Sequence, residues 1–174
     1  MSKLNFTIRR AEPSDVKDFC ALMGDPEVFP NLLQLPYPSE IAWQERLNEK
    51  PEGGRLHLVA VSNDQVIASA GVWPNESIRR RHACSLGISV ASHSHGQGVG
   101  SALMSALTEY VDKWTTFLRV ELTVFADNQA ALSLYERFGF SREGVHRGYG
   151  LRNGQFQDVI SMARLHPNPP RIGG

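Results

Sequence analysis

The stretch LGISVASHSHGQGVGSALM, residues 86–104, joins two kinds of secondary structure through a glycine-rich turn. The part that ends at Val90 is apolar and β-branched, as strands are. From Val99 to Trp114 apolar residues recur every three or four positions, which predicts a helix buried along one stripe. Glycine lets the backbone of the turn between the strand and the helix approach a ligand closely. The free N–H groups at the start of a helix favour phosphate oxygens. We therefore expect an anion cradle here, although a flexible strand-to-helix connection would explain the glycines equally well.

Two familiar phosphate-binding motifs are excluded by the spacing. No Lys-Ser or Lys-Thr follows the glycines as in a P-loop, and Leu103 stands where a dinucleotide fingerprint requires its last glycine. A phosphate bound at this turn would have to be held in another way.

The C-terminal half continues with a strand from Leu118 to Ala126, which must return parallel to the strand ending at Val90 through the intervening helix. Asn128 is expected to cap another helix, which ends at Gly139 and carries an apolar face of Ala131, Leu134, Tyr135 and Phe138. Two last strands, near 140–150 and 156–165, flank the turn pair Asn153-Gly154.

The N-terminal half predicts a strand at 6–10, a helix at 13–23, a proline-rich functional loop at 24–38 and a helix from Ser39 stopped by 52–54. A hairpin at 56–61 and 66–73 and a strand at 82–90 complete it. This order is not the strict alternation of a doubly wound fold. The fold class expected is mixed α/β (α+β), with a mainly antiparallel sheet and one parallel switch.

Length and composition limit the classes of protein. A chain of 174 residues predicts one domain, 1–165, followed by a flexible tail, 166–174. Eighteen basic residues balance eighteen acidic ones, which argues against a non-specific nucleic-acid binder. The sequence shows neither a signal peptide nor a membrane-length apolar run, and Cys20 and Cys84 form no CxxC pair. A cytoplasmic protein without nucleic-acid or membrane partners is expected.

Two motifs resemble the GNAT superfamily of N-acetyltransferases. The run His95-Gly96-Gln97-Gly98-Val99-Gly100 resembles the family's Arg/Gln-x-x-Gly-x-Gly/Ala loop. Asn128, Ala131 and Tyr135, followed by ERFGF, match its Asn-x-x-Ala-x-x-x-Tyr helix. The resemblance runs from Ile8 to Arg164 and is greatest to bacterial amino-acid N-acyltransferases, which share PEV, LQ.P.PS, WQERL, ELTVF.DN and LRNG. It implies a seven-stranded sheet with about four helices and a splayed central strand pair.

The resemblance implies acetyl-CoA as acyl donor. Backbone amides from Gly96 through Gln97, Gly98, Val99 and Gly100 to Ser101 would hold its pyrophosphate. His95 replaces the usual Arg or Gln, so one side-chain phosphate contact is weaker. Backbone groups of Ile88 and Val90 would pair with the pantetheine arm like an added strand. Asn128 would bond the pantetheine or order the splayed strands, beside Ala131, although a plain helix cap explains Asn128 equally well.

The resemblance also suggests the catalytic groups. Tyr135 would hydrogen-bond the departing thiolate and supply a proton as general acid, whereas without the family a core tyrosine is the better interpretation. The N–H of Val90 would stabilise the oxyanion. Some relatives place a glutamate where this chain has Thr123, and Glu121 lies two residues earlier on the same strand face, so Glu121 is the candidate base. A solvated cross-strand glutamate is the alternative.

The acceptor wall is expected in the proline-rich loop. Phe29, Leu32, Leu33, Leu35 and Tyr37 are its apolar candidates, with Asn31, Gln34, Trp43 and Tyr149 as polar or aromatic neighbours. Core packing or a dimer contact explains the same residues nearly as well. His82, His93 and His95 lack a carboxylate or cysteine at a ligand spacing, so no metal site is predicted.

The resemblance predicts acetyl-CoA-dependent N-acetylation of a small amine by direct attack in a ternary complex, with a free hydrophobic L-amino acid as the expected acceptor. A polyamine, an antibiotic or a protein N-terminus is the alternative acceptor. A non-catalytic acyl-CoA sensor is the alternative class. Because relatives often dimerise, a homodimer is a further expectation.

Overall fold

A computed structural model of the chain describes residues 4–172. The strands form one sheet of order β1-β2-β3-β4-β5-β7-β6. Their bounds are β1 (Thr7–Arg10), β2 (Leu56–Ser62), β3 (Gln65–Pro74), β4 (Ala83–Val90), β5 (Arg119–Phe125), β6 (Ser141–Arg152) and β7 (Gln155–Leu165). The helices are α1 (Val16–Gly24), α2 (Glu40–Leu47), α3 (Val99–Trp114) and α4 (Gln129–Arg137). All neighbouring strands pair antiparallel except β4 and β5, which pair parallel as expected.

The two hairpins form where turn residues tolerate a positive φ. Asn63 and Asp64 join β2 to β3 with φ of 49° and 60°, and Asn153 and Gly154 join β6 to β7 with φ of 51° and 76°. Positive φ at both central positions is the requirement of a type I′ turn, whose twist matches that of the strands. These turns set the register of each hairpin.

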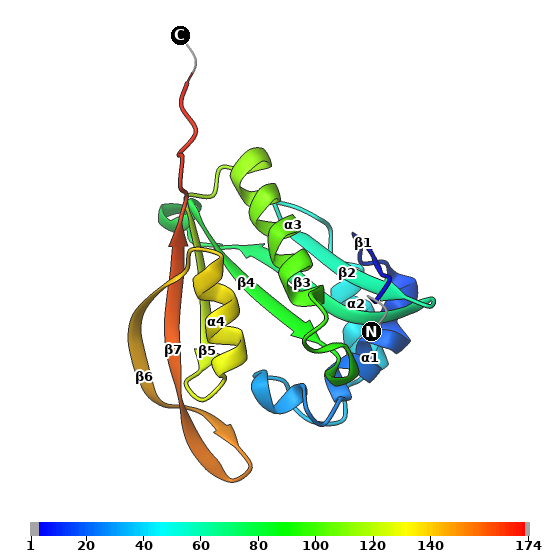
Figure 1. Ribbon diagram of the computed structural model, residues 1–174. Coiled ribbons are helices and arrows are strands. Elements are labelled where there is room, and N and C mark those ends of the chain that lie inside the picture. The colour runs from blue at the N-terminus through cyan, green and yellow to red at the C-terminus, as the bar shows by residue number, and fades with distance from the viewer. Residues whose placement is uncertain (1–3, 173–174) are drawn as a thin grey trace.

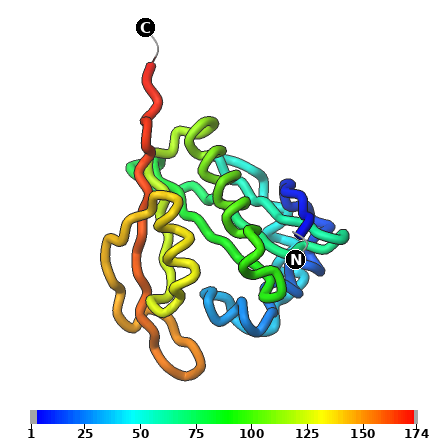
Figure 2. The backbone as a smooth tube through the Cα atoms, in the orientation of Figure 1, coloured from blue at the N-terminus to red at the C-terminus, as the bar shows by residue number. Residues whose placement is uncertain are grey.

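The helices cover both faces of the sheet (Figures 1 and 2). α3 and α4 pack on one face, around a large core that contains the fully buried Leu103, Leu107 and Met162. α1 and α2 pack on the other face, around a smaller core that contains Phe19 and Trp43. Within residues 4–172, no helix is long and apolar enough to cross a membrane.

The parallel pairing of β4 with β5 is short. It joins Ala83 to Arg119, Cys84 to Val120 and Ser85 to Glu121, and it goes no further. β4 nevertheless continues to Val90 and β5 to Phe125, each paired along its outer edge with β3 or β7. The two strands therefore splay apart over their second halves, as the family resemblance implies, and leave a gap in the middle of the sheet (Figure 1).

Three segments differ in detail from the expected elements. The first helix begins with a 3-10 turn at Pro13–Asp15. α2 ends at Leu47, before Lys50-Pro51, because the residue before a proline disfavours helical geometry. His166, the first residue of the expected tail, is still hydrogen-bonded to the body of the protein, because its backbone N–H donates to the carbonyl of Leu118 (2.9 Å). The chain beyond it extends away from the sheet (Figure 1), and residues 173–174 lie outside the described residues.

Asp25 fastens the proline-rich loop to the end of β4. Its Oδ2 accepts hydrogen bonds from the backbone N–H of Ser92 (3.0 Å) and from the Ser92 hydroxyl (2.8 Å). Its Oδ1 accepts from the N–H of Glu27 (2.9 Å). Partial burial alone would raise the pKa of Asp25, but these donors and nearby His95 outweigh burial and lower it. The loop is therefore held against the segment that leads into α3.

We predict that Asp25→Asn lowers the free energy of unfolding by about 1–3 kcal/mol at pH 7, because an amide cannot reproduce the charge-assisted bonds. The folded-state pKa lies below the unfolded one, so this contribution is present above the unfolded pKa of about 3.9 and is lost as pH falls through the folded value. Urea unfolding at pH values from 7 down to about 2 measures it, since this range extends below the usual carboxyl pKa. Asp64→Asn, at an exposed hairpin turn, is the matched control. A difference between Asp25→Asn and wild type that stays constant down to the lowest pH would contradict the assignment.

Candidate active site

A cavity of about 700 Å³ occupies the gap between the splayed strands. Its walls come from β4, β5, the segment entering α3, the helix α4 and the loop after α1. In Figure 1 this loop lies between the start of α3 and the hairpin of β6 and β7. Pockets that bind small molecules and cofactors have volumes of this size.

The free edge of β4 faces the cavity. The N–H of Ala91 donates to the carbonyl of Ile67 in β3 (2.8 Å). Peptide groups alternate in direction along a strand, so the N–H and C=O groups of Ile88 and Val90 point the opposite way, into the gap. Both residues line the cavity. β4 can therefore accept an extended ligand as a further strand.

The glycine-rich segment forms the cradle expected from the sequence. Gly96 and Gly98 have φ of 71° and 82°, and Gly98 is the N-cap of α3. The first turn of α3 contains no acidic residue, so its free N–H groups and the positive end of the helix dipole are available to an anion. Gly96, Gly98, Val99, Gly100 and Ser101 all line the cavity.

Two side chains of this segment, those of Gln97 and His95, contact backbone carbonyls of the protein itself. Gln97 does not line the cavity, and its amide donates to the carbonyl of His93 (2.9 Å). His95 does line it, but Nε2 of its ring donates to the carbonyl of Val90 (2.8 Å). His95 thus ties the cradle to β4 and occupies one of the two acceptor positions of the Val90 carbonyl, whereas the Val90 N–H points into the gap.

α4 supplies the opposite wall. Asn128 accepts the N–H of Ala131 (3.1 Å) as the N-cap of α4, and both residues also line the cavity. Leu134 packs closely on α3: a Cβ added at Gly100 would lie 3.4 Å from Leu134 Cδ2 and 3.7 Å from Val90 Cγ2. The absence of a side chain at Gly100 lets the start of α3 approach both β4 and α4.

Tyr135 presents a hydroxyl to the cavity. The residue is 6% exposed, and its ring packs on Phe140 with centroids 5.7 Å apart. Its hydroxyl makes no hydrogen bond within residues 4–172, and the residue lines the cavity. Burial raises the pKa of Tyr135 far above its ordinary value, so the phenol is neutral and keeps its proton as a donor.

Glu121, the base expected from the sequence, lies outside the cavity. Its carboxylate accepts hydrogen bonds from Arg80 Nη2 (2.5 and 2.6 Å) and from Arg119 Nε (2.5 Å). Partial burial would raise the pKa of Glu121, but the two arginines outweigh it and lower the pKa. On the same strand Thr123 reaches the cavity, because β5 leaves β4 only after Glu121. The structure thus gives Glu121 a place in an ion-pair network.

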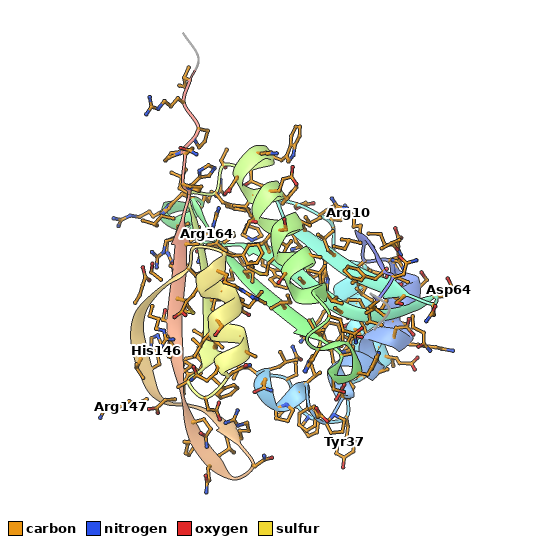
Figure 3. All side chains as sticks on the ribbon, viewed as in Figure 1. Arg10, Tyr37, Asp64, His146, Arg147 and Arg164 are labelled. Atoms are coloured by element: carbon orange, nitrogen blue, oxygen red, sulfur yellow. The ribbon has the colours of Figure 1, made fainter. Side chains whose placement is uncertain are left out.

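The loop after α1 contributes part of the expected acceptor wall. Asn31, Leu32, Leu33 and Gln34 line the cavity, whereas Phe29 and Tyr149 do not. Leu35 is 83% exposed and Tyr37 96%, and Tyr37 points away from the body of the protein (Figure 3). Trp43 packs on Phe19 in the core between α1 and α2.

The cavity also contains polar residues that sequence reasoning did not select. They are Glu27, Ser89, Ser94 and Arg137. Ser94 is 2% exposed, and its hydroxyl is the one buried side-chain polar atom of residues 4–172 without a hydrogen bond. Glu27 lies in the DPEV run of the loop, where a carboxylate beside a proline is an ordinary solvated residue by pattern alone. No group of three or more His, Cys, Asp or Glu side chains suited to a metal ion occurs in the described part of the chain.

Comparison with known proteins identifies the same family. The model of the acetyltransferase (GNAT) family matches residues 23–140. The L-amino acid N-acetyltransferase AaaT of Escherichia coli (strain K12) is 40% identical over 158 residues, which cover 91% of this chain and 96% of that protein. The ribosomal protein uS5-alanine N-acetyltransferase of Escherichia coli is 28% identical over 76% of this chain and 70% of its own length.

Solved structures share the fold. A GNAT-family acetyltransferase of Streptococcus pneumoniae has a TM-score of 0.82 and 26% identity, covering 92% of this chain and 99% of its own. A phosphinothricin acetyltransferase of Sinorhizobium meliloti in complex with acetyl-CoA has a TM-score of 0.85 at 19% identity, with 96% and 94% covered. Together with the splayed strands and the glycine cradle, these matches show that the chain belongs to the GNAT family of acetyltransferases, enzymes that take their acetyl group from acetyl-CoA.

Proposed function

We propose that this enzyme acetylates the α-amino group of a free, hydrophobic L-amino acid by direct transfer within a ternary complex. The observation that carries the proposal is the 40% identity to an L-amino acid N-acetyltransferase over nearly the full length of both chains. A second feature supports it, since the acceptor loop brings the apolar side chains of Leu32 and Leu33 to the cavity.

The residues along the gap fit the donor. The amides at the start of α3 would hold the pyrophosphate, and the backbone of Ile88 would pair with the pantetheine arm, which leaves the N–H of Val90 for the thioester end. Bound acetyl-CoA supplies the acetyl group as a thioester. The cradle and the edge of β4 meet where Val90 enters the segment before α3, so the thioester would lie between β4 and Tyr135.

Two groups of this chain would act on the reacting atoms. The Val90 N–H points into the gap and would donate to the oxyanion of the tetrahedral intermediate. The neutral phenol of Tyr135 would donate a hydrogen bond to the departing sulfur. Its raised pKa makes it a weak acid but a permanent donor, and a thiolate in a buried site needs such a donor.

The attacking amine must lose a proton, and Glu27 is the carboxylate on the cavity wall that we propose for this task. Glu27 belongs to the acceptor loop, on the same wall as Asn31. Its negative charge would attract the ammonium form of the acceptor and receive a proton directly or through water. Glu121 is engaged by two arginines outside the cavity and is given no such role.

We predict that Tyr135→Phe lowers kcat about 100-fold or more while leaving acetyl-CoA affinity unchanged. The ring and its packing on Phe140 remain, and the hydroxyl has no hydrogen bond within residues 4–172 to lose. Steady-state kinetics at saturating substrates and a binding titration measure both quantities. Tyr110→Phe is the control, because its hydroxyl donates to the Gly54 carbonyl (3.3 Å) outside the cavity. Full kcat in Tyr135→Phe would exclude the role as proton donor.

We predict that Glu27→Gln lowers kcat about 100-fold near pH 7 and that the deficit shrinks as pH rises and more amine is already neutral. Glu121→Gln should leave kcat unchanged and lower the free energy of unfolding by about 1 kcal/mol, because Arg80 and Arg119 lose a partner at a partly exposed site. A pH–rate profile and urea unfolding of both variants provide the comparison. A large loss of kcat in Glu121→Gln together with unchanged kcat in Glu27→Gln would instead identify Glu121 as the base.

The acceptor class is tested by release of coenzyme A thiol from acetyl-CoA. The panel contains the L-amino acids, spermidine, an aminoglycoside and a peptide with an N-terminal alanine. We expect the highest kcat/KM with hydrophobic L-amino acids. Preference for the polyamine, the antibiotic or the peptide would redirect the acceptor assignment. Binding of acetyl-CoA without turnover on any of them would favour a non-catalytic acyl-CoA sensor.

We also propose that the enzyme works in the cytoplasm and as a homodimer. Its two cysteines are free, as a reducing compartment would leave them. Val145, Leu151 and Phe156 on β6 and β7 are each at least 60% exposed, and an edge strand carrying apolar side chains favours association with a second copy.

A further inference from the structure

Arg152, at the end of β6, does not itself line the cavity, but its side chain contacts two residues that do, Phe125 and Asn31. The guanidinium carbon lies 4.7 Å from the centroid of the Phe125 ring, and Nη2 donates to the Asp127 carboxylate. The Arg152 side chain is 16% exposed, whereas that of Asp127 is 61% exposed. The arginine is therefore held in a fixed, largely desolvated position by a partner that itself remains in water.

The atoms around Arg152 belong to the acceptor side of the cavity. Arg152 Nη1 makes a long contact of 3.5 Å with Asn31 Oδ1, and Asn31 in turn donates from Nδ2 to the Glu27 carbonyl (3.3 Å). Phe125, Asn31 and Glu27 all line the cavity. A Cβ added at Gly150 would lie 3.1 Å from Phe125 and 3.2 Å from Leu33, so the end of β6 is pressed against both.

The guanidinium has capacity for a second anion. It carries five N–H donors in a planar fork that matches a carboxylate. Within residues 4–172, Nη2 serves Asp127, Nη1 has only the long contact with Asn31, and Nε has no hydrogen bond. Stacking on Phe125 fixes the plane of the fork, which reduces the entropy lost when a ligand binds.

One carboxylate on the cavity wall, that of Glu27, and one guanidinium just behind the wall, that of Arg152, suit a zwitterion. Glu27 lies on the loop that supplies Asn31, and Arg152 approaches the same Asn31 from β6. An α-amino acid carries an ammonium and a carboxylate on one carbon, so it needs one carboxylate and one cation placed close together. Arg137 also lines the cavity, but it belongs to the last turn of α4 and not to the loop after α1 or the end of β6.

We propose that Arg152 binds the α-carboxylate of the acceptor and thereby makes the enzyme select free amino acids over amides, peptides and polyamines. This inference rests on the proposed function and names the residue that determines its specificity. Asn31 would turn its amide toward the same carboxylate once the long contact with Arg152 is replaced. The apolar side chain of the substrate would then lie against Leu33 and Phe125.

The test compares L-leucine with L-leucinamide, which has the same amine and side chain but no carboxylate. Wild-type enzyme is expected to prefer L-leucine. Arg152→Gln should raise the KM for L-leucine about 10- to 100-fold and leave that for L-leucinamide unchanged, because only the acid uses the charged hydrogen bonds. Arg152→Lys should give an intermediate KM, since it keeps the charge without the fork.

Two further variants separate recognition from structural support. Asp127→Asn removes the other partner of the ion pair, and it should raise the KM for L-leucine much less than Arg152→Gln does, because the guanidinium and its stacking on Phe125 remain. Arg142→Gln changes an arginine of the same strand that pairs with Glu136 outside the cavity, and it should behave as wild type. Acetyl-CoA binding and a thermal melt verify that each variant is folded.

The outcomes distinguish this inference from the proposed function. Three results would overturn the role of Arg152 while leaving amino-acid acetylation intact. The first is an equal change in KM for L-leucine and L-leucinamide in Arg152→Gln, and the second is an equal change in the KM for L-leucine in Asp127→Asn and Arg152→Gln. The third is equal use of L-leucine and L-leucinamide by the wild-type enzyme. Absence of turnover on both acceptors and on the wider amino-acid panel would overturn the proposed function, and this inference with it.

Discussion

The short parallel pairing between β4 and β5 is the constraint on which the rest of the structure depends. After Ser85 and Glu121 the two strands no longer pair with each other, although β4 remains paired with β3 and β5 with β7. Unpaired backbone N–H and C=O groups in the middle of a sheet would be costly if they were buried without partners. Here these groups face a cavity, so a bound ligand can make the hydrogen bonds that a neighbouring strand would otherwise make. The proposed cofactor site is in this sense a missing part of the sheet.

Side chains keep the gap open and also shape it. α3 and α4 lie on the same face of the sheet, and their contact at Gly100 and Leu134 sets how far β4 can move toward β5. On the other face, Asp25 fastens the acceptor loop to the segment that follows β4. A cavity of this size persists in a well-packed domain because its walls are anchored in two separate cores.

The sequence predicted whatever depends on local periodicity and turn chemistry. The helix at 99–114, the two hairpins and the glycine cradle are where the pattern places them, because each is determined by residues within one or two turns of each other. Roles that depend on distant contacts were not predictable. Glu121 shares a strand face with Thr123, yet it lies on the paired side of the splay, next to Arg80 and Arg119. Arg152 and Asn31 are 121 positions apart, and no local pattern links them.

The two sides of the cavity use different parts of the chain, and this division explains why the fold alone does not define the substrate. The proposed donor side consists mainly of backbone groups from β4 and the start of α3, which many sequences can supply. A structure with 19% identity accordingly reaches a TM-score of 0.85. The acceptor side consists of side chains from the loop after α1 and the end of β6, brought together by tertiary contacts at Asn31 and Gly150. Substitutions there leave the core and the cradle untouched, so selectivity for the acceptor can change without loss of the donor site. An account of specificity in this enzyme must therefore begin with the residues on that side, where Asn31 contacts both the backbone carbonyl of Glu27 and the guanidinium of Arg152.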